Sequence, residues 1–153
     1  MDLHYEPVGK DNREAISKLE ILPEQSGYIE TVAQCLSEAD RDRKWHPVGI
    51  YDGEQLVGFA MYGYFFWEYF PVGRLWLDRF LIDCHYQGRG YGKAALIGLL
   101  ELLSRKYPKK KVYLSVIREN STAIRLYQEF GFRFNGEKDI HGEDVMVKDS
   151  GRQ

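Results

Sequence analysis

The sequence of 153 residues predicts a mixed α/β sandwich, in which helices cover a β-sheet. Strand-like and helix-like patterns alternate along the whole chain, with no linker, repeat or low-complexity stretch between them. The turn signal Asp52-Gly53 joins two apolar runs and is typical of a β-hairpin. Residues 78–103 read as a buried strand, a glycine-rich turn and an apolar helix. The length corresponds to one domain, which we place at residues 1–150.

Local signals predict the elements in order. Asp11 is followed three residues later by Glu14, a spacing typical of a capping box, and Pro23 interrupts the helix that starts there. Pro108 ends a later helix whose leucines recur at core-facing spacing. The expected strands are 3–8, 48–51, 56–64, 75–82, 112–117, 132–137 and 144–148. The expected helices are 11–22, 28–40, 94–107 and 121–130.

Composition excludes several classes of function. The net charge of −2 and the pI near 6.1 disfavour a general nucleic-acid binder, which usually presents a basic face. No apolar run approaches the ~18 residues of a membrane span, and the polar first ten residues are unlike a secretory signal. Cys35 and Cys84 form no C-x-x-C pair, and the four histidines show no ligand spacing. We therefore expect a cytoplasmic protein without a metal, a membrane or a nucleic acid as partner.

The glycine-rich turn carries the strongest chemical signal. Arg89 and Lys93 lie in the first turn of the following helix, where cations oppose the helix dipole unless an anion compensates them. Free N–H groups at such a turn are suited to a phosphate. The turn is not a nucleotide P-loop, because the residue five before Gly92 is Gln87 and Ala94 follows Lys93. It also lacks the G-x-G-x-x-G spacing of a dinucleotide-binding turn.

Two motifs resemble those of the GNAT family of acyl-CoA-dependent N-acetyltransferases. The first is Gln87-Gly88-Arg89-Gly90-Tyr91-Gly92, which matches the family's pyrophosphate loop Q-x-x-G-x-G. The second, residues 120–132, matches N-x-x-A-x-x-L-Y-x-x-x-G-F. The resemblance implies a mixed, mostly antiparallel sheet with splayed central strands, flanked by helices. It also implies acetyl-CoA as the co-substrate.

The resemblance assigns cofactor roles to particular positions. The open backbone of Phe80, Leu81 and Ile82 would pair with the amides of the pantetheine arm. Asn120, Ser121 and Ala123 would line that arm, although Asn120 could instead only cap its helix. The residues expected to hold the diphosphate are Gln87, Gly88, Arg89, Gly90, Tyr91, Gly92 and Lys93.

The resemblance also implies a direct transfer that needs an acid and a base. Tyr127 is the proposed general acid for the departing thiolate. Asp78 is our candidate for accepting the proton of the amine, since it shares a strand face with Trp76 and Phe80, which would raise its pKa. Asp83 is the second choice, and the alternative to Asp78 as base is a structural carboxylate paired with an arginine. Cys84 is not expected to be a nucleophile, because neighbouring side chains on an extended segment point apart.

The acceptor is expected to be a small cationic amine. Residues 45–73 contain no Lys or Arg, and aromatic residues surround Glu68 there. Segments such as Trp76-Leu77-Asp78-Arg79-Phe80 and Phe134-Asn135-Gly136-Glu137 are similar to those of bacterial spermine/spermidine (diamine) N-acetyltransferases. This implies acetylation of a polyamine, with Glu24, Tyr28 and Glu30 as acceptor contacts, and such relatives are commonly homodimers. The alternatives are acetylation of a protein N-terminus, a peptide or another small amine, and a CoA-binding regulatory module without turnover.

Overall fold

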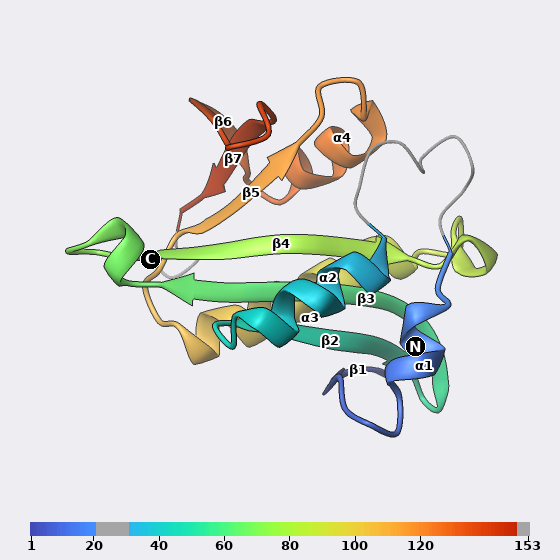
Figure 1. The fold of residues 1–153 in the computed structure, drawn as a ribbon. Helices are drawn as coiled ribbons and strands as arrows, with labels where there is room; N and C mark the ends of the chain where they lie inside the picture. The colour runs from blue at the N-terminus through green and yellow to red at the C-terminus, as the bar shows by residue number, and fades with distance from the viewer. Residues whose placement is uncertain (21–30, 150–153) are drawn as a thin grey trace.

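A computed structural model describes residues 1–20 and 31–149 of the chain (Figure 1). Its centre is a seven-stranded sheet in the order β1-β2-β3-β4-β5-β7-β6. Neighbouring strands are antiparallel except β4 and β5, which are parallel. The strands are β1 (Leu3–Pro7), β2 (Trp45–Asp52), β3 (Gln55–Phe65), β4 (Arg74–Ile82), β5 (Val112–Val116), β6 (Arg133–Lys138) and β7 (Asp144–Lys148). The predicted fold class, a mixed and mostly antiparallel sheet flanked by helices, is confirmed.

Helices cover both faces of the sheet, and Figure 1 shows α2 crossing in front of it and α3 behind. On one face α1 and α2 bury a core that includes Ile16, Leu36 and Phe59. On the other face α3 buries Leu96 and Leu99 in a larger core. No helix within the described residues is long and apolar enough to cross a bilayer. The helices are α1 (Arg13–Ser17), α2 (Val32–Arg41), α3 (Tyr91–Lys106) and α4 (Ser121–Glu129), with 3₁₀ turns η2 (Trp67–Tyr69) and η3 (Cys84–Tyr86).

The first helix is where the sequence prediction was wrong. Helix α1 ends at Ser17 instead of near Leu22, and its N-cap is Asn12 instead of Asp11. The Asn12 side chain makes no capping bond, because it accepts from the Gly9 N–H and donates to a carbonyl of β1. The capping box lies instead at α2, where the Thr31 and Gln34 side chains bond to each other's backbone N–H. Residues 21–22 and 28–30, which complete the two predicted helices, lie outside the described residues.

A β-bulge interrupts β4 at its centre. The adjacent β3 residues 61 and 62 pair with Arg79 and Leu77, so Asp78 has no opposite residue on that strand. Beyond the bulge the alternation of faces is reset, and Leu77 and Phe80 both pack against the core that α3 covers. The bulge interrupts the period of two from which the shared face of Asp78 and Phe80 was predicted, so that expectation stays a prediction.

Strands β4 and β5 separate soon after they begin. Their pairing consists of two steps, Leu75 with Val112 and Trp76 with Tyr113. Figure 1 shows β5 leaving the direction of β4 and carrying β6, β7 and α4 away from the rest of the sheet. The splayed central strands expected from the sequence are confirmed. The separation leaves one backbone edge of β4 open from residue 77 to residue 82, since β3 pairs with the other edge.

Candidate active site

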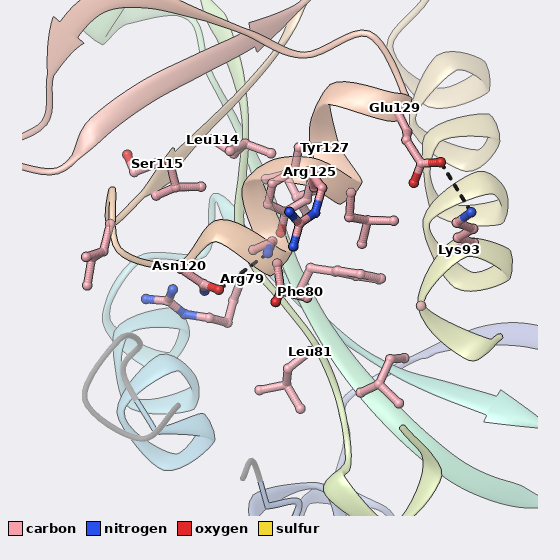
Figure 2. Close-up of a pocket in the computed structure, with 18 of the residues that line it drawn as sticks. Arg79, Phe80, Leu81, Lys93, Leu114, Ser115, Asn120, Arg125, Tyr127 and Glu129 are labelled. Carbon is pink, nitrogen blue, oxygen red and sulfur yellow. Dashed lines mark hydrogen bonds and ion pairs between the residues drawn. The ribbon is translucent and has the colours of Figure 1, made fainter. Parts of the chain in front are cut away.

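A cavity of about 750 Å³ fills the space between the separated strands (Figure 2). Residues 77–82 of β4 form one wall, and residues 114–117 at the end of β5 face them. Helix α4 and the turn before α3 close the sides. Figure 2 shows Phe80 and Leu81 on the β4 side and Asn120, Arg125 and Tyr127 on the α4 side.

The turn before α3 presents main-chain N–H groups to this cavity. Gly88 and Gly90 have φ of 78° and 85°, which side chains rarely adopt, and Gly90 is the N-cap of α3. None of the N–H groups of residues 88–93 donates to an acceptor among the described residues. A Cβ built at Gly88 or Gly92 would meet nothing within 4 Å. The glycines therefore leave space in front of the free N–H groups, and a diphosphate fits the polarity of that space.

Most of the predicted cofactor residues come together here. The cavity is lined by Phe80, Leu81, Ile82, Gln87, Gly88, Gly90, Gly92, Lys93, Asn120 and Ala123. Arg89, Tyr91 and Ser121 do not line it. The Arg89 guanidinium lies 5.4 Å from the ring centre of Tyr86, and the Tyr91 hydroxyl donates to Asp52 over 2.6 Å. Tyr91 therefore ties the start of α3 to the β2–β3 hairpin.

Two of the predicted residues make bonds that shape the cavity wall. The Gln87 side-chain amide donates to the Ile82 carbonyl over 2.9 Å, so it fixes the turn against the end of β4. The Asn120 side chain accepts from the Ala123 N–H over 3.3 Å and also lines the cavity. Asn120 is therefore placed both to cap α4 and to face a bound ligand.

The sequence predicted Arg89 and Lys93 as the cations for a bound anion, but the structure shows a different set of cations at the cavity. Lys93 is paired with Glu129 of α4, 3.2 Å away, so a carboxylate already compensates part of its charge (Figure 2). Arg125 lines the cavity and forms no ion pair with any described residue. Sequence reasoning missed Arg125 and Thr122, although both lie inside the second motif. Arg125 is thus the cation available to a phosphate from the α4 side.

Tyr127 is buried in the cavity wall beside Phe132, with ring centres 5.6 Å apart. Burial raises the pKa of Tyr127 to about 12, and the nearby charge of Arg79 opposes the rise. Its hydroxyl makes no hydrogen bond to any described residue. The phenol therefore keeps its proton at working pH and is free to donate it to a ligand.

A second cavity, of about 1100 Å³, adjoins the first on the side of α2, η2 and the β6–β7 hairpin. Seven of its lining residues are Asp or Glu, and three are Lys or Arg. The seven acids are Glu38, Asp42, Glu68, Asp78, Glu137, Asp139 and Glu143. Trp45, Phe65, Tyr69 and Trp76 supply aromatic faces. Acids with aromatic faces favour a cationic ligand.

Five residues line both cavities and so mark the place where they meet: Asp78, Arg79, Ser115, Ile117 and Glu143. Among the described residues, Asp78 and Glu143 are the carboxylates at this junction. The pKa of Glu143 is raised, first by burial and then by the charge of Asp139. Sequence reasoning missed Glu143, because it comes from the β6–β7 hairpin, far from either motif. The charge of Asp78 also contributes to the raised pKa of Glu143.

Asp83, the second-choice base, lies outside both cavities. Its carboxylate is buried and accepts from the N–H groups of Glu20 and His85, and these bonds lower its pKa although burial works against them. Its Oδ1 also lies 2.7 Å from His85 Nδ1. Asp83 is thus used to join η3 to the segment after α1.

Cys84 follows Asp83 on η3, a 3₁₀ turn instead of the extended segment expected. Its sulfur lies 3.7 Å from His85 Nδ1, so the two side chains do not point apart as predicted. The ring nitrogen is nearer to the Asp83 carboxylate, and burial with the charges of Asp83 and Glu20 raises the pKa of the thiol. Asp83, Cys84 and His85 place three ligand-type atoms within 4.8 Å, but both Asp83 oxygens already accept backbone N–H groups.

The predicted acceptor contacts Glu24, Tyr28 and Glu30 lie outside the described residues. Glu38 of α2, which is described, lines the second cavity. Glu20 instead bonds through its backbone to η3, where its carbonyl accepts from Cys84.

Comparison with known proteins places this geometry in a family. The acetyltransferase (GNAT) family matches residues 13–132, which include both motifs and the bulged strand. The chain belongs to the GNAT acetyltransferase family. A spermine/spermidine N(1)-acetyltransferase of Bacillus subtilis strain 168 is 48% identical over 151 residues, covering 97% of this chain and 99% of the relative. A probable spermine N(1)-acetyltransferase of Bacillus subtilis subsp. natto is 49% identical with the same coverage.

Solved structures of other N-acetyltransferases share the fold. The spermidine N-acetyltransferase of Vibrio cholerae in complex with CoA and spermine has a TM-score of 0.70 and 19% identity. That comparison covers 95% of this chain and 93% of the other. The PaiA N-acetyltransferase of Thermoplasma acidophilum in complex with coenzyme A has a TM-score of 0.66 and 16% identity, covering 97% and 99%. At 16% and 19% sequence identity, the structural similarity shows a shared fold and nothing more.

Proposed function

We propose that this GNAT protein transfers the acetyl group of acetyl-CoA to a primary amine of a polyamine such as spermidine or spermine. One observation carries the proposal: a cavity with free main-chain N–H groups at one end meets an acid-rich cavity at Asp78, Arg79 and Glu143. The first suits the diphosphate of a thioester carrier, and the second suits a multiply charged cation. The two Bacillus relatives, named for spermine and spermidine acetylation, support the same acceptor.

We assign deprotonation of the amine to the carboxylates at the place where the two cavities meet. A primary amine of pKa about 10.4 is neutral in only about one molecule in 2,500 at pH 7, so the reaction needs a group that takes its proton. Asp78 is the proposed acceptor of that proton, because the bulge places it in the wall of both cavities. Glu143 is the second carboxylate there, and it would hold the positive charge of the incoming amine.

Departure of the thiol is assigned to Tyr127. With its pKa near 12, complete proton transfer to a thiolate of pKa about 8.5 would cost roughly 5 kcal/mol. Donation of a hydrogen bond to the developing charge needs no such transfer and stabilises the transition state directly. The free hydroxyl, held beside the open edge of β4, is available for this bond.

The proposal also covers cofactor binding, cellular compartment and oligomeric state. Phe80 to Ile82 would bond the pantetheine arm through their open backbone edge, and the turn of residues 88–93 would hold the diphosphate. The two thiols, Cys35 and Cys84, form no disulfide, which is compatible with the reducing cytoplasm we expect. We also propose that the protein forms a homodimer and has no nucleic-acid or membrane partner.

A panel of amines tests the function and its alternatives. The purified protein is incubated with acetyl-CoA and, separately, with spermidine, spermine, a diamine, a peptide with a free N-terminus and an aminoglycoside. Thiol release is followed and products are identified by mass. We expect efficient mono-acetylation of spermidine, measurable mono-acetylation of spermine and little reaction with the peptide. A preference for the peptide would replace the proposal with N-terminal acetylation, and no thiol release with any amine would favour a regulatory CoA-binding module.

A further inference from the structure

At one end of the acid-rich cavity an arginine of the chain occupies a site built for a cation. Arg74, the first residue of β4, has a side chain that is 22% exposed. Its two terminal nitrogens donate to the two carboxylate oxygens of Glu137 over 2.8 and 2.9 Å. The guanidinium carbon lies 4.7 Å from the ring centre of Tyr69 and 4.2 Å from that of Tyr113.

A third ring lies beside these two. The Trp76 ring centre lies 5.5 Å from that of Tyr113 and 6.4 Å from that of Tyr69. Aromatic faces around a carboxylate are the arrangement that proteins use to bind alkylammonium groups. Here that cage, made of Tyr69, Trp76, Tyr113 and Glu137, already holds Arg74.

Three of the four cage residues, Tyr69, Trp76 and Glu137, line the same acid-rich cavity as the junction. Arg74 and Asp78 both line the acid-rich cavity and are four residues apart on β4, about 13 Å along an extended strand. An acceptor whose reacting amine lies at Asp78 and whose tail follows β4 would bring a distal ammonium toward the Arg74 guanidinium. Like charges at that end oppose the binding of such a tail.

We propose that Arg74 determines which acceptor lengths the site accepts, by filling the aromatic cage and repelling the distal ammonium of long polyamines. The inference rests on the proposed acetylation of polyamines. Substitution of Arg74 by a neutral residue would leave an empty cage with an anionic Glu137, and a distal ammonium could then bind there.

The test compares ratios instead of single rates. For the wild type and Arg74→Gln, kcat/KM is measured with spermine and with a short diamine. The kcat/KM for spermine divided by that for the diamine is expected to rise about ten-fold in Arg74→Gln. One new charged contact, between the distal ammonium and Glu137, accounts for a change of this size. Arg74→Lys, which keeps the charge, should retain the wild-type ratio. Arg13→Gln removes a similar two-bond pair with Asp40 on the α1–α2 surface and should also leave the ratio unchanged.

A second measurement needs no variant. The wild type is given alkylamines matched in length, one series ending in a methyl group and the other in an ammonium. Where the tail is long enough to reach Arg74, the neutral tail should be preferred. An unchanged ratio in a folded Arg74→Gln, or no preference for neutral tails in the wild type, would overturn the role of Arg74. Absence of turnover with every polyamine would instead refute the proposed function.

Discussion

Lys93 Nζ lies 3.2 Å from Glu129 Oε2, so an ion pair between two residues that line the first cavity joins the first turn of α3 to the last turn of α4. Both side chains are more than half exposed, at 61% and 55%, so the pair contributes little to stability. Its main consequence is electrostatic, because Glu129 competes with a bound phosphate for Lys93.

Glu129→Gln is therefore expected to tighten the binding of coenzyme A by roughly two- to five-fold at low salt, since Lys93 is released toward the phosphates. The melting temperature should change little. Calorimetric titration of coenzyme A at two salt concentrations measures the effect. Weaker binding in the variant would show that the ion pair shapes the site instead of competing with the ligand.

Tyr127→Phe should lower kcat by roughly ten-fold or more, because the phenol is the donor to the departing thiolate. The ring keeps its packing against Phe132, so the dissociation constant of coenzyme A should stay within about two-fold of the wild type. Steady-state kinetics with a parallel binding titration separate the two effects. Unchanged turnover would remove Tyr127 from the mechanism.

Asp78→Asn should lose activity unevenly with pH. Below the pKa of the amine, about 10.4, the reaction needs an acceptor for its proton, and the loss should be about 100-fold near pH 7. As the pH approaches 10 more of the amine is neutral, so the loss should shrink. The pH profile of kcat/KM for both proteins measures this. A loss by the same factor at every pH would indicate that Asp78 supports the bulge instead of taking a proton.

Glu143→Gln gives a prediction for stability with a definite sign. The pKa of Glu143 is raised in the folded protein, so the folded state holds the proton more tightly than the unfolded chain does. The charged form therefore costs stability above the folded pKa, and the cost disappears below the unfolded value of about 4.3. The neutral variant should melt higher than the wild type at pH 7.5 and equal to it near pH 4. A gain that is the same at both pH values would contradict this assignment.

Local signals were sufficient for the parts of the site that one segment builds. The glycine-rich turn between a strand and a helix was predicted from the sequence, and in the structure Gly88 and Gly90 have positive φ there. The second motif likewise placed Tyr127 and Asn120 in one cavity with the turn. In these segments the chemistry depends on spacing along the chain, which the sequence displays directly.

Features that arise between segments were not predictable in the same way. The bulge at Asp78 depends on how β4 pairs with β3, and no residue type in β4 predicts it. Glu143 and Arg74 acquire their roles from neighbours 60 or more residues away, such as Glu137 beside Arg74. Asn12, the N-cap residue of α1, makes no capping bond because its side chain bonds to Gly9 and Pro7 in the turn after β1.

The proposed reaction depends on the N–H groups of residues 88–93, which would bind a diphosphate and so place an acyl group beside Asp78 and Tyr127. Calorimetric titration of the wild type with coenzyme A and with pantetheine, which lacks the diphosphate, tests it most directly. We expect coenzyme A to bind at least about 100-fold more tightly, because charge-assisted bonds to the diphosphate supply most of the binding energy. Equal affinity for the two compounds, or no binding of coenzyme A, would contradict the account.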